Sequence, residues 1–205
     1  MDPGAGGPAV ARTGLVERRV DWTTDPERRY DLGMVLDARL AKLAHGQSAR
    51  DAALAFARSR TEKVAAAERA RADEFEAILE AMFLMAAVDG EVAKDEVGQL
   101  AASVQAIVDT TGGRFQLDLG PTLDELAARL AREGWKGRLD TLARRLPSPE
   151  SRAFALRLAA AVAFVDDNVV HAEAAAIDAM AAALAIPPDE SQRILTEVHE
   201  ELFGG

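Results

Sequence analysis

The sequence predicts an all-helical protein, and three observations carry that prediction. Apolar residues make up 49% of the 205 residues but aromatic residues only 5%, and Ala, Leu, Arg and Glu dominate, which is typical of closely packed helices. Apolar side chains recur at helical spacing along most of the chain. A stretch of sequence also occurs twice, which is typical of a duplicated unit. We therefore expect a bundle of about seven to eight helices with an internal duplication.

The composition divides the chain into three segments. Residues 1–30 begin with a Gly- and Pro-rich stretch and continue as a charged, irregular one, so we expect a flexible N-terminal tail. Residues 31–74 are expected to form a helical extension or arm. Their first part has helical spacing at Val35, Leu36, Leu40 and Leu43, whereas Ala49–Ala70 has few large apolar residues and suggests a long solvated helix or an exposed arm. Residues 75–205 are expected to be the duplicated helical domain.

Two helices are predicted at the start of that domain. Apolar residues become dense from Phe75 onward and lead to an acidic turn at Asp89. A second helix is expected over 93–109, ended by two threonines and two glycines.

The remaining helices follow from their boundary residues. Pro121 and Thr122 open one helix, and another is expected from Trp135 to Leu146, before Pro147-Ser148-Pro149. The second copy then predicts helices over 150–165 and 171–185 and a last helix that reaches Phe203.

Composition also excludes several kinds of chemistry. The chain has no cysteine, which rules out disulfides, zinc–thiolate sites and thiol nucleophiles. No apolar stretch reaches the roughly 18 residues of a membrane span, and the N-terminus lacks the apolar core of a signal peptide. We expect a cytoplasmic protein without a membrane span, which leaves peripheral membrane association through a partner open. The net charge of −10 argues against nucleic acid as a ligand.

The repeated stretch is an acidic turn. Asp89-Gly90-Glu91-Val92, followed by Glu96, returns 77 residues later as Asp166-Asp167-Asn168-Val169, followed by Glu173. The apolar frame repeats at the same offset, as in Val88 and Val165 or Leu100 and Ile177. If the two turns face each other, four carboxylates lie close together, those of Asp89, Glu96, Asp166 and Glu173. Such a cluster requires protons or a cation, and hard oxygen ligands favour Ca, Mn or Mg. These four residues are the candidate metal ligands.

The turn is not a conventional calcium loop. Asp-Gly-x-Val-x-x-x-Glu matches only the second half of a calcium-binding helix–loop–helix. In the first half, Met85 and Ala87 stand where Asp or Asn is required, and so do Val162 and Phe164 in the second copy.

A purely structural interpretation stays open beside the metal site. If the following helices start near Ala93 and Val170, Glu96 and Glu173 occupy the third helical position, where Glu reaches back to the N-H of the cap residue. The aspartates would then bond loop amides. The cap residues themselves, Ala and Val, cannot supply the reciprocal hydroxyl bond.

Two runs carry a resemblance to a known family. AMFLMAAVDGEVAKDEVGQLAASV and RLAAAVAFVDDNVVHAEAAAIDAMAAALAIPPDESQRIL resemble the TerB family of tellurite-resistance proteins, whose duplicated helical domains carry Asp-Gly-x-Val/Ile-(Ser/Thr)-x-x-Glu turns. The resemblance covers residues 75–203. It implies an all-helical domain with an acidic, cation-binding face in metal, oxidant and phage stress systems. The chain departs from this pattern at Asp167, which replaces the usual Gly, at both cap positions, and in its longer N-terminal segment.

These observations lead to one functional hypothesis and one alternative. We expect a non-enzymatic, TerB-like, cation-binding sensor or adaptor in tellurite, metal, oxidant or phage stress response, with a protein partner. No nucleophile or phosphate loop accompanies the carboxylates, so an enzyme is the least supported class. The alternative is a scaffold or assembly subunit that binds another protein through residues 31–74, with purely structural acidic turns.

Overall fold

The computed structural model describes residues 47–88, 98, 100–105, 118–164 and 171–203. The helices with described bounds are α2 (Gln47–Thr61), α3 (Ala66–Ala86), α5 (Gly120–Arg145), α6 (Pro149–Ala163), α7 (His171–Ala183) and α8 (Pro188–Phe203). Residues 98 and 100–105 are also helical, and no strand occurs in these ranges. The prediction of an all-helical protein is confirmed. None of the helices in these ranges combines the length and the apolar content of a membrane span.

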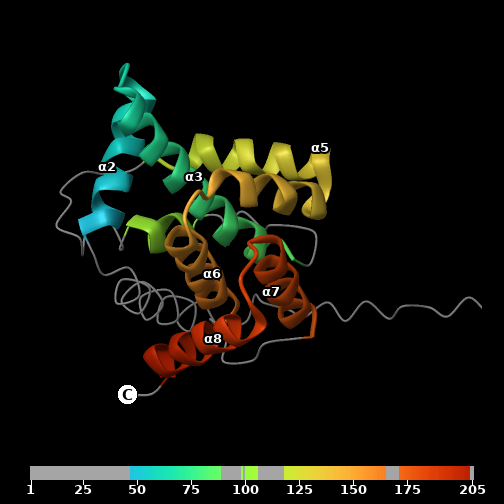
Figure 1. The fold of residues 1–205 in the computed structure, drawn as a ribbon. Helices are drawn as coiled ribbons and strands as arrows, with labels where there is room; N and C mark the ends of the chain where they lie inside the picture. The colour runs from blue at the N-terminus through green and yellow to red at the C-terminus, as the bar shows by residue number, and fades with distance from the viewer. Residues whose placement is uncertain (1–46, 89–97, 99, 106–117, 165–170, 204–205) are drawn as a thin grey trace, which may run out of the picture.

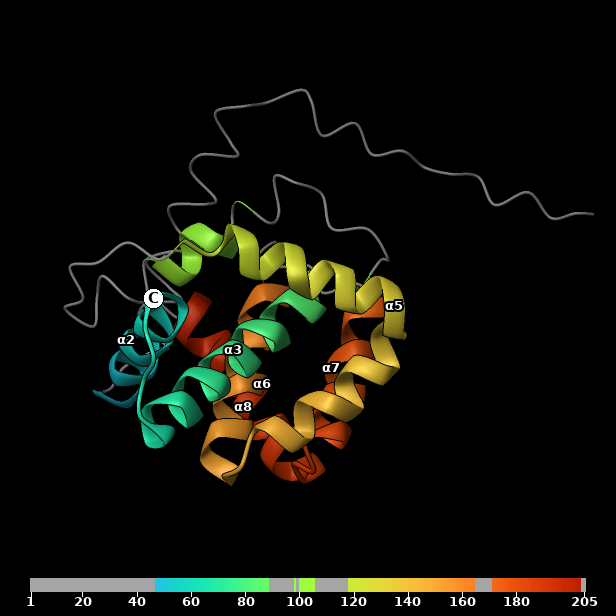
Figure 2. The same ribbon diagram turned by 90° about the horizontal axis from the view of Figure 1, so that it is seen from above.

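Helix α3 occupies the centre of the molecule. It contacts α2, α5, α6 and α7, and Figure 2 shows it between α2 and α7, with α6 beneath it and α5 across it. Its sequence explains this position, because the second half of the helix is apolar on nearly every side. Every residue of α3 from Ala77 to Met85 is buried, including Glu80. A helix that is apolar all round must be covered by neighbours on all sides.

Helix α2 packs against α3 instead of extending from it. The expected long solvated helix or arm over Ala49–Ala70 is interrupted at residues 62–65, and the chain turns back to form an α2–α3 hairpin (Figure 1). Phe56 is buried, and its ring lies 5.2 Å from that of Phe75. Three alanines of α2 are buried beside it, Ala52, Ala53 and Ala55. Small side chains let helices approach closely, so alanine forms a packed face on a helix that we expected to be solvated or exposed.

Helix α5 consists of two straight segments joined at Gly134. This glycine has φ 71° and ψ 162°, a conformation that other residues hardly adopt. Figure 2 shows the sharp bend at which the second segment turns back along the body. The two helices that we predicted, one opened by Pro121 and one beginning near Trp135, correspond to these segments.

Local hydrogen bonds define the start of α6 and the end of α7. Ser148 accepts a hydrogen bond from Ser151 N, and the Ser151 hydroxyl in turn accepts one from Ser148 N, which is a reciprocal capping box. At the end of α7, Ile186 N donates to Ala181 O and Ala185 N donates to Ala182 O. Ala185 has φ 55°, so this is a Schellman motif with alanine in the usual glycine position.

Candidate functional site

Of the four predicted metal ligands, the structure places one. Glu173 is the third residue of α7 and is half-buried, in agreement with the expected third helical position. Asp89, Glu96 and Asp166 lie outside the described residues. Among the residues that the structure describes, no three His, Asp or Glu side chains are grouped so that they could hold a metal ion. The proximity of the two acidic turns therefore stays a prediction.

The helices that lead into the two turns end in the same way. Helix α3 ends at Ala86 and α6 at Ala163, a spacing of 77 residues that equals the offset of the sequence repeat. The next residues, Ala87 and Phe164, have nearly equal backbone angles, φ −94° and ψ 12° for the first and φ −86° and ψ 6° for the second. In both, the cap N-H points back to carbonyls of the last turn. The chain thus leaves both helices in the same local conformation.

Trp135 holds the last turn of α3 from outside. Its indole Nε1 donates to the carbonyl oxygen of Leu84 at 2.9 Å. The last carbonyls of a helix lack partners within the helix, so this bond satisfies one of them. Leu84 precedes Asp89 by five residues in the sequence, so Trp135 contacts the last part of the helix that leads toward the first acidic turn.

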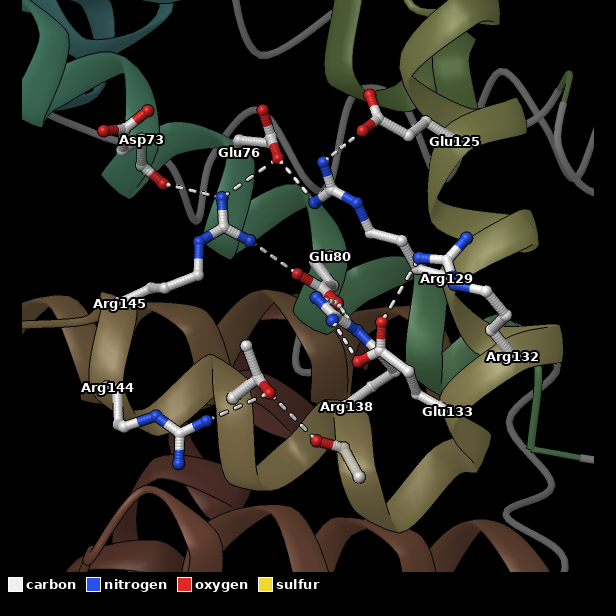
Figure 3. A network of polar contacts seen from close by, with 12 residues as sticks. Asp73, Glu76, Glu80, Glu125, Arg129, Arg132, Glu133, Arg138, Arg144 and Arg145 are labelled. Atoms are coloured by element: carbon white, nitrogen blue, oxygen red, sulfur yellow. Dashed lines mark hydrogen bonds and ion pairs between the residues drawn. The ribbon is translucent and has the colours of Figure 1, made fainter.

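A buried ion pair lies further back along α3. The Glu80 and Arg138 side chains are only 2% and 6% exposed. Arg138 Nε and Nη2 both contact Glu80 Oε1, at 2.7 and 2.6 Å, while Arg145 Nη1 donates to Glu80 Oε2 at 2.6 Å (Figure 3). Both carboxylate oxygens are thus engaged by arginines of α5. Such pairing is needed because an uncompensated charge at this depth costs several kcal/mol, on the order of 3–5.

Further carboxylates surround this pair. Glu76 accepts hydrogen bonds from Arg129 and Arg145, each at 3.0 Å, and Glu133 accepts one from Arg138 at 2.7 Å. The hydrogen bond from Arg129 is the main cause that lowers the pKa of Glu125, and the bond from Arg138 lowers the pKa of Glu133 in the same way. Together with Glu80, we call these residues the arginine–glutamate network (Figure 3).

The chemistry of the network is structural. Both carboxylate oxygens of Glu80 accept bonds from arginines, so this side chain is not available as a metal ligand or proton acceptor. Arg138 and Arg145, both on the second segment of α5, each reach two or more acceptors and bind Glu80, which fixes that segment on α3. The network therefore orients the helix that leads into the first acidic turn.

The arginine–glutamate network was not predicted from the sequence. Its residues stand on helices whose charged positions are usually solvated. The available signal was Glu80 itself, a charged residue in the middle of the apolar run Ala77–Met85, because a charge on such a face requires a partner.

Comparison with known proteins identifies no relative of this chain. The chain matches no protein-family model, and neither the curated proteins nor the solved structures include a significant match. Its function is therefore inferred from its own residues.

Proposed function

We propose that the protein is a non-enzymatic, TerB-like adaptor or sensor that binds a divalent cation, Ca, Mn or Mg, through Asp89, Glu96, Asp166 and Glu173. The role is the stress-response role that the resemblance implies. Two anionic turns brought together repel each other, and a cation bound by hard oxygen ligands removes that repulsion. The same cation would alter the geometry at the end of α3.

One observation supports the proposal above the others. Helices α3 and α6 end at positions 77 residues apart with nearly the same cap conformation, so the two acidic sequences start from equivalent backbone geometry. Glu173 is the third residue of α7, and the repeat predicts the same position for Glu96 in the helix that follows the first acidic turn. Equivalent starting geometry is what a pair of duplicated turns with one shared role requires.

The test is a calorimetric titration of calcium and manganese into protein freed of metal with a chelator. We expect saturable binding to the original chain. In the double variant Asp89→Asn and Asp166→Asn, affinity should fall at least about tenfold, or about 1.4 kcal/mol, because two anionic ligands become neutral. A matched control is Asp140→Asn with Asp178→Asn, which removes two exposed carboxylates outside the repeated turns. Equal affinities in all three proteins would show that the turns do not bind the cation.

Trp135 offers a second measurement on the same question. In a Trp22→Phe variant it is the remaining tryptophan, and its indole contacts the last turn of α3. We expect its fluorescence to change with the same saturation curve as the calorimetric signal.

The scaffold alternative is weakened by the position of α2. That hypothesis assigns partner binding to residues 31–74, of which 31–46 lie outside the described residues. In α2, the apolar face that contains Phe56 is buried within the chain itself. The part of the segment that the structure describes therefore presents only its outward face to a partner.

A further inference from the structure

A polar cleft lies between α2 and α3, near the closed end of their hairpin. Its volume is about 210 Å³. Phe56 and Ala72 line it together with Ser59, Arg60, Arg69, Asp73 and Glu76. Phe56 and Ala72 form the apolar base of the cleft, and charged side chains of both signs surround it. Sites for drug-sized molecules are larger, about 300–1,000 Å³, so this cleft suits a small ligand.

Three charged side chains of the cleft, all exposed, make no hydrogen bond or ion pair in the described part of the chain. Neither the Arg60 nor the Arg69 guanidinium makes a hydrogen bond or ion pair with a described residue. Asp73 accepts a bond from Arg145 through its carbonyl oxygen (Figure 3), while its carboxylate makes no hydrogen bond or ion pair with a described residue. Glu76, by contrast, is held by Arg129 and Arg145. Among the described residues, the cleft therefore offers two guanidinium groups and one carboxylate that form no ion pair, and the Arg60 charge acts at longer range on the Glu125 carboxylate, whose pKa it helps to lower.

These arginines are not needed to close the hairpin. Arg58 already joins the two helices, because its Nη1 contacts Glu68 of α3 at 2.8 Å while its Nε contacts Glu62 at 2.8 Å. Phe56 and Phe75 also pack against each other between the two helices. The charges of Arg60 and Arg69 are therefore not explained by the packing of α2 on α3.

We propose that this cleft binds a small zwitterion with a net charge of −1, such as an acidic amino acid or a phosphorylated amine. Its anionic groups contact Arg60 and Arg69, whose planar guanidinium groups suit carboxylate and phosphate oxygens. Its ammonium group contacts the Asp73 carboxylate. Two guanidinium groups and one carboxylate have a net charge of +1, which such a ligand neutralises. The Ser59 hydroxyl donates to Phe56 O at 2.8 Å, so its oxygen remains an acceptor for a ligand N-H.

The experiment is calorimetric titration of the full chain with glutamate and with phosphoethanolamine, in the presence of a chelator. The chelator separates this test from cation binding at the acidic turns. We expect saturable binding of at least one probe, and a loss of affinity of at least about tenfold in the double variant Arg60→Gln and Arg69→Gln. The matched control, Arg144→Gln with Arg193→Gln, removes two exposed arginines that do not line the cleft and should bind as the original chain does.

A second variant tests the ammonium contact. Asp73→Asn should weaken glutamate binding but leave the binding of glutarate, which has two carboxylates and no ammonium group, unchanged or stronger. An equal loss of affinity for both compounds would contradict a contact between Asp73 and the ammonium group, and with it the proposal that the ligand is a zwitterion. Two results would overturn the site. One is the absence of saturable binding of either probe up to about 10 mM, which corresponds to a binding free energy of about −3 kcal/mol. The other is equal affinity of the original chain and the Arg60/Arg69 variant. Circular dichroism of each variant separates lost binding from lost folding.

Discussion

Glu80 brings a charged group into the packed centre of the protein. It lies in an otherwise apolar stretch of α3 and is engaged by Arg138 and Arg145 of α5. Buried ion pairs contribute little net stability compared with apolar residues of the same volume, but removal of one partner leaves an uncompensated buried charge. The pair therefore selects one position of α5 on α3 more than it stabilises the fold.

Substitution of Glu80 tests this view. We expect Glu80→Ala to lower the free energy of unfolding by about 3 kcal/mol, because Arg138 is then buried with only Glu133 as a partner. The double variant Glu80→Leu with Arg138→Met should be within about 1 kcal/mol of the original chain, since it removes both charges. Urea unfolding followed by circular dichroism measures both.

The control for this pair is the exposed ion pair between Lys136 and Asp140. Asp140→Asn should change the free energy of unfolding by no more than about 0.5 kcal/mol. A loss with Glu80→Ala that is no larger than this control would contradict a buried, paired Glu80.

The helix boundaries depend on two residues with positive φ. Gly134 divides α5 with φ 71°, and Ala185 ends α7 with φ 55°. A side chain at the first position is unfavourable whatever space surrounds it, because the backbone conformation itself is one that only glycine adopts readily. At the second position alanine already carries the cost of a left-handed conformation, about 1–2 kcal/mol.

Two substitutions should therefore have opposite effects. Gly134→Ala should lower the free energy of unfolding by about 1–3 kcal/mol, and Ala185→Gly should raise it by about 0.5–1 kcal/mol, after the greater freedom of glycine in the unfolded chain is subtracted. The control is Gly137→Ala, where a Cβ would meet Glu133 Cβ at 3.7 Å, an ordinary contact; alanine there should be neutral or stabilising. Thermal and urea unfolding compare the three variants. A stable Gly134→Ala protein would contradict the bend in α5.

The contacts of α3 with α2, α5, α6 and α7 join the described helices into one core. Elements that share one core unfold together when no contact surface is weak enough to separate first. Helix α8 is joined to this core through α6, where Arg157 pairs with Glu197 and Glu201.

Unfolding of the whole chain should accordingly be a single transition. In a Trp22→Phe variant, Trp135 fluorescence reports the α3–α5 contact and circular dichroism reports all helices. We expect the two signals to give the same urea midpoint. A fluorescence midpoint well below that of the circular dichroism would show that α5 separates from α3 before the other helices unfold.

Much of the fold could be predicted from the sequence, because helix formation and helix boundaries depend on residues that are close together in the chain. The helical class follows from composition and apolar spacing, and the helix boundaries near Trp135 and at Pro147-Ser148-Pro149 follow from residues that commonly begin or end helices. The cap residues Ala87 and Phe164 repeat the 77-residue offset of the sequence. Of the candidate metal ligands, sequence placed Glu173 correctly at the third position of α7.

Long-range contacts were not accessible in this way. The packing of α2 on α3 depends on buried alanines, whose weak apolar signal resembles that of an exposed helix. The bond from Arg138 to Glu80 joins residues 58 positions apart, and the polar cleft unites side chains of two helices. Periodicity states which face of a helix is apolar, but it contains no information about which other helix covers that face. That choice depends on shape and charge complementarity between distant segments, and these exist only once the chain has folded.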